Sequence, residues 1–159
     1  LDKLVKECKK GYEEYNFFIP AIAIREFTWN VFAAHYIEMV KARAYGIDFS
    51  DEERDGAIFT LHKTLATILK LLAPITPFIT EHLWKTLYSD ESIHQQKQVS
   101  VENVEEQTDI TKEISEFNSK VWNEKKSQNL SLKDSIKIEI PKILEPFKKD
   151  LKSMHNLVD

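Results

Sequence analysis

Few residues in this sequence have the type and spacing that catalysis or metal binding requires. His62 and His82 lie in helix-forming segments, but neither has a second ligand four residues away, and no CxxC pair occurs. Cys8, the single cysteine, has no sequence context that defines a nucleophile and its base. The acidic run at 51–53 is explained by helix capping. The sequence therefore predicts no catalytic residue and no metal site.

Aromatic residues offer the more promising chemistry. Phe17 and Phe18 lie at a break between two expected helices, where a ring can project from a helix end. The preceding helix carries lysines that could contact phosphates: Lys6, Lys9 and Lys10. An exposed ring beside such lysines is suited to stacking on a base of single-stranded nucleic acid. The alternative is that Phe17 closes the core. A core position is expected for four aromatic residues of the next helix: Phe27, Trp29, Phe32 and Tyr36.

Composition limits the class of protein. The 159 residues are 42% hydrophobic and 30% charged, with a net charge of −4 and a pI near 5.8. These values are typical of a globular domain, and no apolar run reaches the roughly 18 residues of a membrane span. An acidic chain does not bind nucleic acid through bulk charge, so a local basic face or base stacking would be needed. One cysteine and no signal peptide favour the cytoplasm. The chain does not begin with methionine, which indicates a fragment or a processed protein.

Apolar periodicity predicts four helices in the first ninety residues. A helix over 2–15 is followed by a long one from Pro20 to about Ala44, with Gly46 as its stop. Ser50 and Glu53 form a capping box that opens a third helix. Its apolar seam is Ile58, Leu61, Leu65, Ile68 and Leu72. A short fourth helix, 77–88, is expected to bury Phe78, Leu83, Trp84 and Leu87.

Two prolines interrupt the most hydrophobic stretch of the chain. Pro74 ends the third helix because proline removes a backbone donor and clashes with the preceding turn. Thr76 and Pro77 suit the N-cap and first turn of the next helix. The segment is therefore predicted to be a tight corner within a four-helix bundle.

A different organisation follows the bundle. Residues 89–107 are polar and mark a boundary, and Thr108 is predicted to cap a fifth helix. Residues 135–140 alternate apolar and polar side chains as a half-buried strand does, and a helix over 144–154 follows. The strand's partner is either 99–104 or a segment beyond Asp159. The predicted fold is mainly α: a four-helix bundle (1–90), a linker loop (91–107) and a small α/β appendage (108–159).

Two segments carry a family resemblance: EEYNFFIPAIAIREFTWNVFAAHYIEMVKARAY (13–45) and LLAPITPFITEHLWKTLY (71–88). They resemble the anticodon-binding helical domain of class I aminoacyl-tRNA synthetases of the isoleucine, leucine and valine group. Within that group the similarity is greatest to valyl-tRNA synthetases, through 27–30, 35–38 and 77–81, and SIHQQ at 92–96 also fits. The family often has Cys-Asp where Ala33-Ala34 stand here, and a basic residue where Asn16 stands.

The resemblance implies that this chain docks the anticodon stem-loop of valine tRNA. The implied anticodon-binding residues are Asn16, Phe17, Ile79 and Thr80. The HIGH-like and KMSKS-like signatures are absent, so the chain alone should be inactive and hold no cofactor. ATP and valine would bind a catalytic domain of the same polypeptide, which would also carry an editing domain. A cytoplasmic monomer is expected. The alternative is a helical scaffold or protein-interaction module without RNA binding, which the acidic charge favours.

Overall fold

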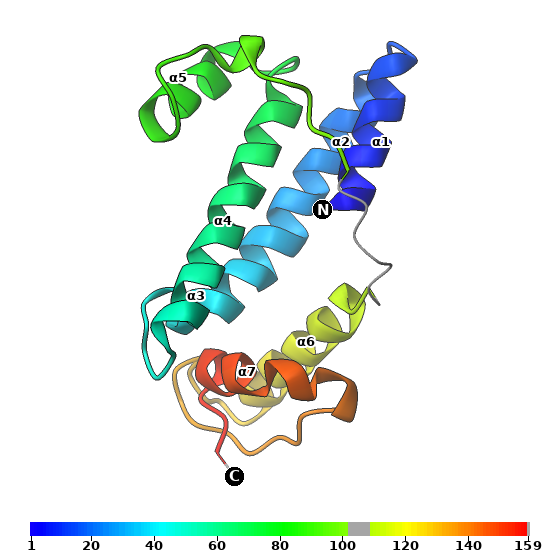
Figure 1. The fold of residues 1–159 in the computed structure, drawn as a ribbon. Helices are drawn as coiled ribbons and strands as arrows, with labels where there is room; N and C mark the ends of the chain where they lie inside the picture. The colour runs from blue at the N-terminus through cyan, green and yellow to red at the C-terminus, as the bar shows by residue number, and fades with distance from the viewer. Residues whose placement is uncertain (102–108, 159) are drawn as a thin grey trace. The chain divides into compact units, whose positions relative to one another are not determined.

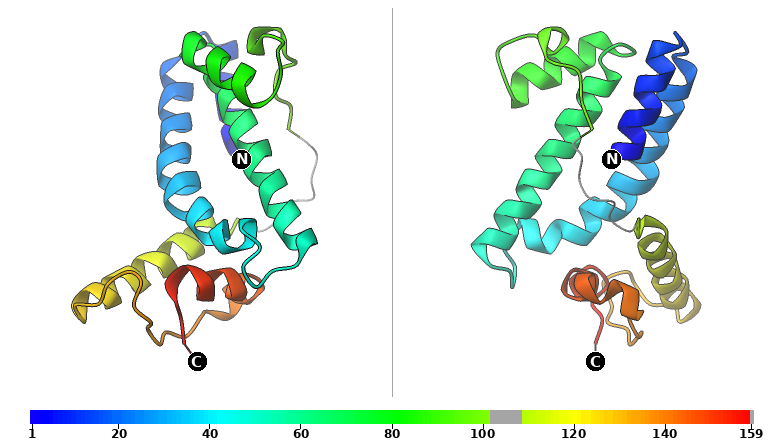
Figure 2. Two further views of the ribbon diagram at one scale, coloured as in Figure 1. Left: turned by 90° about the vertical axis from the view of Figure 1, so that its left-hand side faces the viewer. Right: turned by 45° about the vertical axis from the view of Figure 1, so that its right-hand side comes forward.

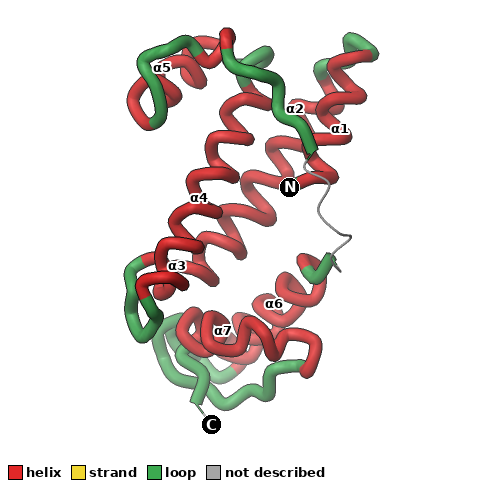
Figure 3. The backbone as a smooth tube through the Cα atoms, in the orientation of Figure 1, coloured by secondary structure: helices red, strands yellow, loops and turns green. Residues whose placement is uncertain are grey.

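The computed structural model describes residues 1–101 and 109–158, and it is mainly helical (Figures 1 and 3). The elements are α1 (Asp2–Glu13), α2 (Phe18–Glu26), the π-helix η1 (Phe27–Ile37), α3 (Glu38–Ala44), α4 (Asp51–Leu72), α5 (Pro77–Leu87), the 3-10 helix η2 (Ile93–Gln95), α6 (Thr111–Ser127), the 3-10 helix η3 (Lys142–Phe147) and α7 (Lys148–His155). The predicted fold class, mainly α, is confirmed.

The boundaries of the first helices follow from their capping residues. Gly46 has a φ of 69°, the left-handed conformation that ends a helix, and it follows α3 closely. At the start of α4 the Ser50 amide donates to Glu53 Oε2 (2.8 Å), while the Glu53 amide donates to Ser50 Oγ (3.2 Å). The backbone hydrogen bond from Ser50 is the main reason that the pKa of Glu53 is lowered. The predicted capping box is confirmed.

The long second helix differs from its prediction in its hydrogen-bond pattern and in the exposure of one aromatic residue. Helical structure runs from Phe18 to Ala44, but residues Phe27–Ile37 have the π-helical hydrogen-bond pattern. Such a run is unusual, because π-helical turns mostly occur singly. Phe32 is buried as expected, whereas Trp29 is 76% exposed, so its predicted place in the core is wrong. Apolar composition alone does not determine which residues of such a segment face solvent.

The chain divides into two compact units. One comprises Leu1–Asn30 with Phe59–Glu106, and the other Val31–Ile58 with Gln107–Asp159. Two of the three points of division, after Asn30 and after Ile58, fall inside helices, η1 and α4. The domains predicted from composition (1–90, 91–107 and 108–159) follow the order of the chain and stay a prediction.

In the first unit α1 packs on α2, and a separate apolar cluster joins α4, α5 and η2. The cluster's buried residues are Leu69, Ala73, Trp84 and Ile93, with Leu65 packed against them. Thr80 and Trp84, four residues apart, form the buried face of α5. Phe78 is 90% exposed and Leu87 48% exposed, so the predicted burial of these two side chains is wrong. Phe78 lies two positions before Thr80, which places it on the opposite face of the helix.

In the second unit α3 packs against α7, and the predicted strand is reduced to a bridge. Ile136 pairs with Leu157 in parallel, and the Val158 amide donates to the Ile136 carbonyl (3.1 Å). The described residues contain no strand (Figure 3). The burial of Ile136 between exposed neighbours matches the predicted alternation. In the described residues the pairing is limited to this one bridge, and residues 102–104 of the other proposed partner lie outside the described part.

The helices of this unit start later than predicted or are divided. α6 has Ile110 as its N-cap; Thr108, the predicted cap, lies outside the described residues. Phe117 and Val121 of α6 are buried as expected. The predicted last helix consists of η3 and α7, and Pro146 lies inside η3. Proline has no amide to donate, so it interrupts the α-helical pattern at that point.

A chain of polar side chains lies in the core of the second unit. His155 Nε2 lies 2.7 Å from Asn118 Oδ1, and Asn118 Nδ2 lies 3.1 Å from His35 Nδ1. His35 Nε2 lies 2.9 Å from Ser115 Oγ. Two neutral imidazoles satisfy this arrangement, since Asn118 accepts from one ring and donates to the other. Burial, with the nearby charge of Lys125, lowers the pKa of His155 to about 4, and burial also lowers the pKa of His35.

Replacing Leu69 by alanine tests the core of the first unit. Leu69 is 4% exposed, so Leu69→Ala should lower the free energy of unfolding by about 2–5 kcal/mol through lost burial and the remaining cavity. Leu87→Ala, at a half-exposed position, is the control and should have a smaller effect. Equal shifts of the urea midpoint for the two variants would contradict the burial described.

Acidification should destabilise the second unit through His155. The unfolded chain takes up a proton near the ordinary pKa of 6.5, whereas the folded chain does so only near 4. Stability from this histidine is therefore complete above about pH 6.5 and is lost as the pH falls toward 4, with a total on the order of 3 kcal/mol.

Urea unfolding between pH 7.5 and 4.5 measures this dependence. His155→Gln should remove a large part of the slope, while replacement of the exposed His82 by Gln should leave it unchanged. The same slope in His155→Gln and the unaltered protein would refute the prediction.

Candidate nucleic-acid interface

The turn between α1 and α2 is formed by a glycine, a proline and an asparagine. A Cβ atom on Gly11 would lie 2.6 Å from Pro20 Cδ, so only glycine allows the two helices to approach this closely. Tyr15 takes a φ of 55°, and the Asn16 amide donates to the Gly11 carbonyl (2.8 Å). Asn16 Oδ1 accepts from the amides of Phe18 (3.2 Å) and Ile19 (3.4 Å), which caps α2. The side chain of Asn16 therefore has a structural task in this turn.

This turn presents aromatic rings to solvent. Phe17 is 48% exposed and Phe18 is 74% exposed. The Phe17 ring meets the ring of Tyr12 edge to face, with centroids 5.6 Å apart. One side of Phe17 is therefore held in place while much of its surface stays open, as the sequence predicted. A ring fixed in this way is prepared for stacking with little loss of rotamer freedom.

The corner between α4 and α5 contacts this turn through the end of α4. The amides of Ile75 (2.8 Å) and Thr76 (2.9 Å) both donate to the Leu72 carbonyl. The Leu71 carbonyl accepts instead from the Tyr12 hydroxyl, at 2.5 Å. Burial, with a smaller contribution from Cys8, raises the pKa of Tyr12 to about 12, so the hydroxyl keeps its proton. The proline corner thus provides the acceptor that joins α4 to α1.

The start of α5 exposes two apolar side chains and buries one predicted site residue. Phe78 is 90% exposed and Ile79 is 53% exposed. Thr80 is 1% exposed, and its hydroxyl donates to the carbonyls of Thr76 (2.9 Å) and Pro77 (3.1 Å). In this structure Thr80 therefore supports the first turn of α5, while Phe78 and Ile79 are open to a ligand.

Both turns lie at the same end of the first unit (Figures 1 and 2). The structure therefore brings Asn16 and Phe17 to the end that also holds Ile79 and Thr80. It adds Phe78, which the sequence analysis placed in the core. The available signal was Pro77: a residue directly after a helix-starting proline lies in the first turn, where few neighbours cover it.

The lysines of α1 lie on its exposed side. Lys6, Lys9 and Lys10 are all exposed, and Lys9 has a distant partner in Glu13 (3.9 Å). An exposed pair at this distance is weak, so the ammonium group stays available to a phosphate.

Glu81 fixes the segment that follows α5. Its Oε2 accepts from the Ser92 hydroxyl and from the Ile93 amide, both at 2.9 Å. The hydrogen bond from Lys85 is the first cause of the lowered pKa of Glu81. The carboxylate therefore holds η2 against α5, and Ile93 enters the core beside Trp84.

The structure offers little for covalent or metal chemistry. Cys8 is buried, and burial with the nearby charge of Glu7 raises its pKa to about 11, so the thiolate is scarce near neutral pH. Across residues 1–101 and 109–158, no three His, Cys, Asp or Glu side chains are grouped as a metal site would require. In the same residues no helix combines the length and apolar character of a membrane span.

The class of protein follows from comparison with known sequences. A family model described as the anticodon-binding domain of tRNA ligase matches residues 1–140. The chain belongs to this family, and the expected resemblance is confirmed.

The similar proteins include valine–tRNA ligases of three archaea. The enzyme of Pyrobaculum aerophilum is 36% identical over 98% of this chain, and that of Aeropyrum pernix 34% identical over 97%. The enzyme of Nanoarchaeum equitans is 40% identical over 82%. The chain spans 20%, 20% and 17% of the length of these relatives.

The cap on α2 yields a prediction. Asn16→Ala should lower the free energy of unfolding by about 1 kcal/mol, because the amides of Phe18 and Ile19 lose their acceptor. Asn16→Asp keeps an acceptor and should retain stability. Thermal unfolding of the two variants compares them, and equal losses would show that the cap is not what Asn16 contributes.

Proposed function

We propose that this chain is the anticodon-binding domain of a valine–tRNA ligase. It docks the anticodon stem-loop of valine tRNA, and the catalytic domain of the same polypeptide attaches valine with the use of ATP. An editing domain belongs to the same polypeptide, which acts as a monomer in the cytoplasm. The chain by itself carries no catalytic residue and needs no cofactor.

One observation carries the proposal: two helix turns at one end of the first unit expose aromatic and apolar side chains. Phe17 and Phe18 come from the first turn, and Phe78 and Ile79 from the second. Sequence-specific recognition of RNA mostly uses bases that are splayed out and stacked on such rings. The family match supports the anticodon as the ligand.

Polar groups of the same end complete the proposed interface. Asn16 holds the turn that bears Phe17 through its backbone amide and Oδ1. Its side-chain nitrogen, Nδ2, is proposed to contact a base edge. Thr80 acts through the first turn of α5, since its hydroxyl is engaged. Lys6, Lys9 and Lys10 supply phosphate contacts, which position the RNA without reading its sequence.

The proposal includes a division of the chain into three parts. Residues 1–90 form the four-helix anticodon-binding bundle, 91–107 the linker, and 108–159 a small appendage. The helix boundaries of α1, α4 and α5 support the first of these. The scaffold alternative has no support from the comparisons, since every relative named above is a valine–tRNA ligase.

Phe17→Ala tests the proposal directly. Loss of a stacked base should weaken binding of valine tRNA by about 1–3 kcal/mol. Stability should change little, because half of the ring is already exposed. Filter binding or fluorescence anisotropy gives the affinity, and thermal unfolding gives the stability.

Two further variants sharpen this experiment. Phe78→Ala should weaken binding in the same way, while Phe59→Ala, an exposed phenylalanine of α4, should leave it unchanged. Lost stability with intact binding would remove Phe17 from the interface. Equal affinity of the unaltered chain for valine tRNA and an unrelated tRNA at every salt concentration would refute specific recognition.

A further inference from the structure

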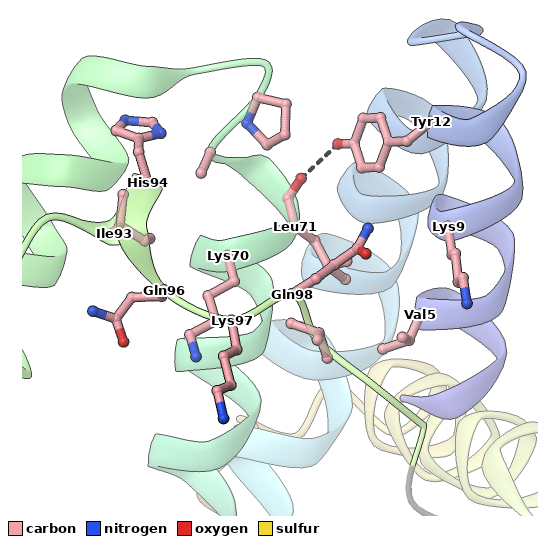
Figure 4. Close-up of a pocket in the computed structure, with 13 residues that line it drawn as sticks. Val5, Lys9, Tyr12, Lys70, Leu71, Ile93, His94, Gln96, Lys97 and Gln98 are labelled. Carbon is pink, nitrogen blue, oxygen red and sulfur yellow. Dashed lines mark hydrogen bonds between the residues drawn. The ribbon is translucent and has the colours of Figure 1, made fainter.

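A cleft of about 210 Å³ lies in the first unit, apart from the exposed rings. It is bounded by α1, by the end of α4, and by the segment that runs from η2 to Val99 (Figure 4). Three lysines line it: Lys9, Lys70 and Lys97. Among the residues that the structure describes, no aspartate or glutamate lines it, although the chain has 26 acidic and 22 basic residues. The cleft therefore concentrates positive charge in a protein that is acidic as a whole.

The three lysines come from separate elements. In Figure 4, Lys9 lies on the α1 side, and Lys70 and Lys97 lie on the α4 side. The Lys70 ammonium lies 5.0 Å from the centre of the Trp84 ring, a contact that orients a cation without neutralising it. Lys97 is exposed on the segment that Glu81 anchors to α5 through Ile93. The fold thus assembles charges that are far apart in the sequence.

Tyr12 connects this cleft to the proposed base-binding end. Its ring lines the cleft and meets Phe17 at 5.6 Å, and its hydroxyl is bonded to the Leu71 carbonyl, another lining residue. The stacking surface and the cleft therefore share a wall. An RNA strand that places a base on Phe17 therefore meets Tyr12, a residue that also lines the cleft.

The size and chemistry of the cleft indicate what occupies it. Pockets that enclose a drug-sized ligand measure roughly 300–1,000 Å³, so this cleft is better suited to one part of a longer molecule. Ammonium groups favour phosphate, and the carboxylate of Glu13 competes only weakly for Lys9, since it lies 3.9 Å away in an exposed pair. Gln98 and His94 add further polar groups to the lining.

We propose that Lys9, Lys70 and Lys97 bind backbone phosphates of the RNA strand whose bases stack at Phe17. This inference rests on the proposed function and assigns a second, sequence-independent subsite to it. Such contacts position the strand and add affinity, while discrimination among tRNAs stays with the base contacts.

Salt dependence of tRNA binding tests the proposal on the whole chain. A triple variant, K9Q/K70Q/K97Q, should bind a valine tRNA transcript about tenfold more weakly at 100 mM salt. The slope of log K against log salt should become shallower by about 2–3, since each of three neutralised phosphates contributes about 0.7–0.9. Affinity for an unrelated tRNA should fall by the same factor. K9R/K70R/K97R keeps the charge and should restore both slope and affinity.

The matched control removes three exposed lysines of α6. K112Q/K120Q/K126Q changes the net charge by the same amount and should leave slope and affinity nearly unchanged. Equal effects of the two triple variants would reduce the result to bulk charge and overturn the site. Binding lost in Phe17→Ala but intact in K9Q/K70Q/K97Q would overturn the cleft alone. No tRNA binding by the unaltered chain would overturn the proposed function together with it.

Acetylation of lysines, read by mass spectrometry, identifies the ligand. Bound tRNA should protect Lys70 and Lys97 and leave Lys112 and Lys120 reactive. Inorganic phosphate at the same ionic strength should give no such protection. Equal protection by inorganic phosphate would assign the cleft to a small anion and overturn the assignment to RNA.

Discussion

The hydrogen bond from the Tyr12 hydroxyl to the Leu71 carbonyl is the constraint on which the arrangement of the first unit depends. Helix α4 has to end for this carbonyl to accept from a side chain, and Pro74 ends it. The partly buried hydroxyl keeps its proton, so the bond persists across the physiological pH range. The end of α4 before Pro74 therefore does more than turn the chain, because it leaves the Leu71 carbonyl as the acceptor that ties α4 to α1.

This contact also affects the two surfaces proposed to bind RNA, the exposed rings and the lysine-lined cleft. Tyr12 supports the ring of Phe17 on one side and forms part of the lysine-lined cleft on the other. Gly11, one residue before it, allows Pro20 to approach and so sets the pairing of α1 with α2. A short stretch of α1 thus determines where an aromatic surface and a basic cleft meet. The proposed binding of a polyanion by an acidic domain is consistent with this arrangement, since charge acts locally when a phosphate is close to the lysines.

The second unit depends on a different balance. Its core holds the hydrogen-bonded pair of His155 and Asn118, and the buried Lys125 donates to the carbonyls of Leu132 and His155 (2.7 Å each). Such a network is stable only while the imidazoles are neutral, because a charged ring would lack an acceptor and would be poorly solvated. The bidentate pair between Arg43 and Asp150 joins α3 to α7 in the same unit. Hydrogen bonds and an ion pair therefore help to specify how the helices of the second unit pack.

The sequence by itself determined the family and several helix ends in the first ninety residues. Capping residues, prolines and the 3.6-residue apolar period act locally, so Ser50 with Glu53, Pro74 with Pro77, and the position of Gly46 were sufficient to place the boundaries. Only the tertiary structure decided which side chains face outward. Phe78 and Trp29 are exposed and Thr80 is buried because burial depends on neighbours from distant segments, which periodicity does not report. Neighbours from distant segments also decide the π-helical pattern of η1 and the reduction of the strand to one bridge at Ile136. They likewise decide that Lys9, Lys70 and Lys97 line one cleft.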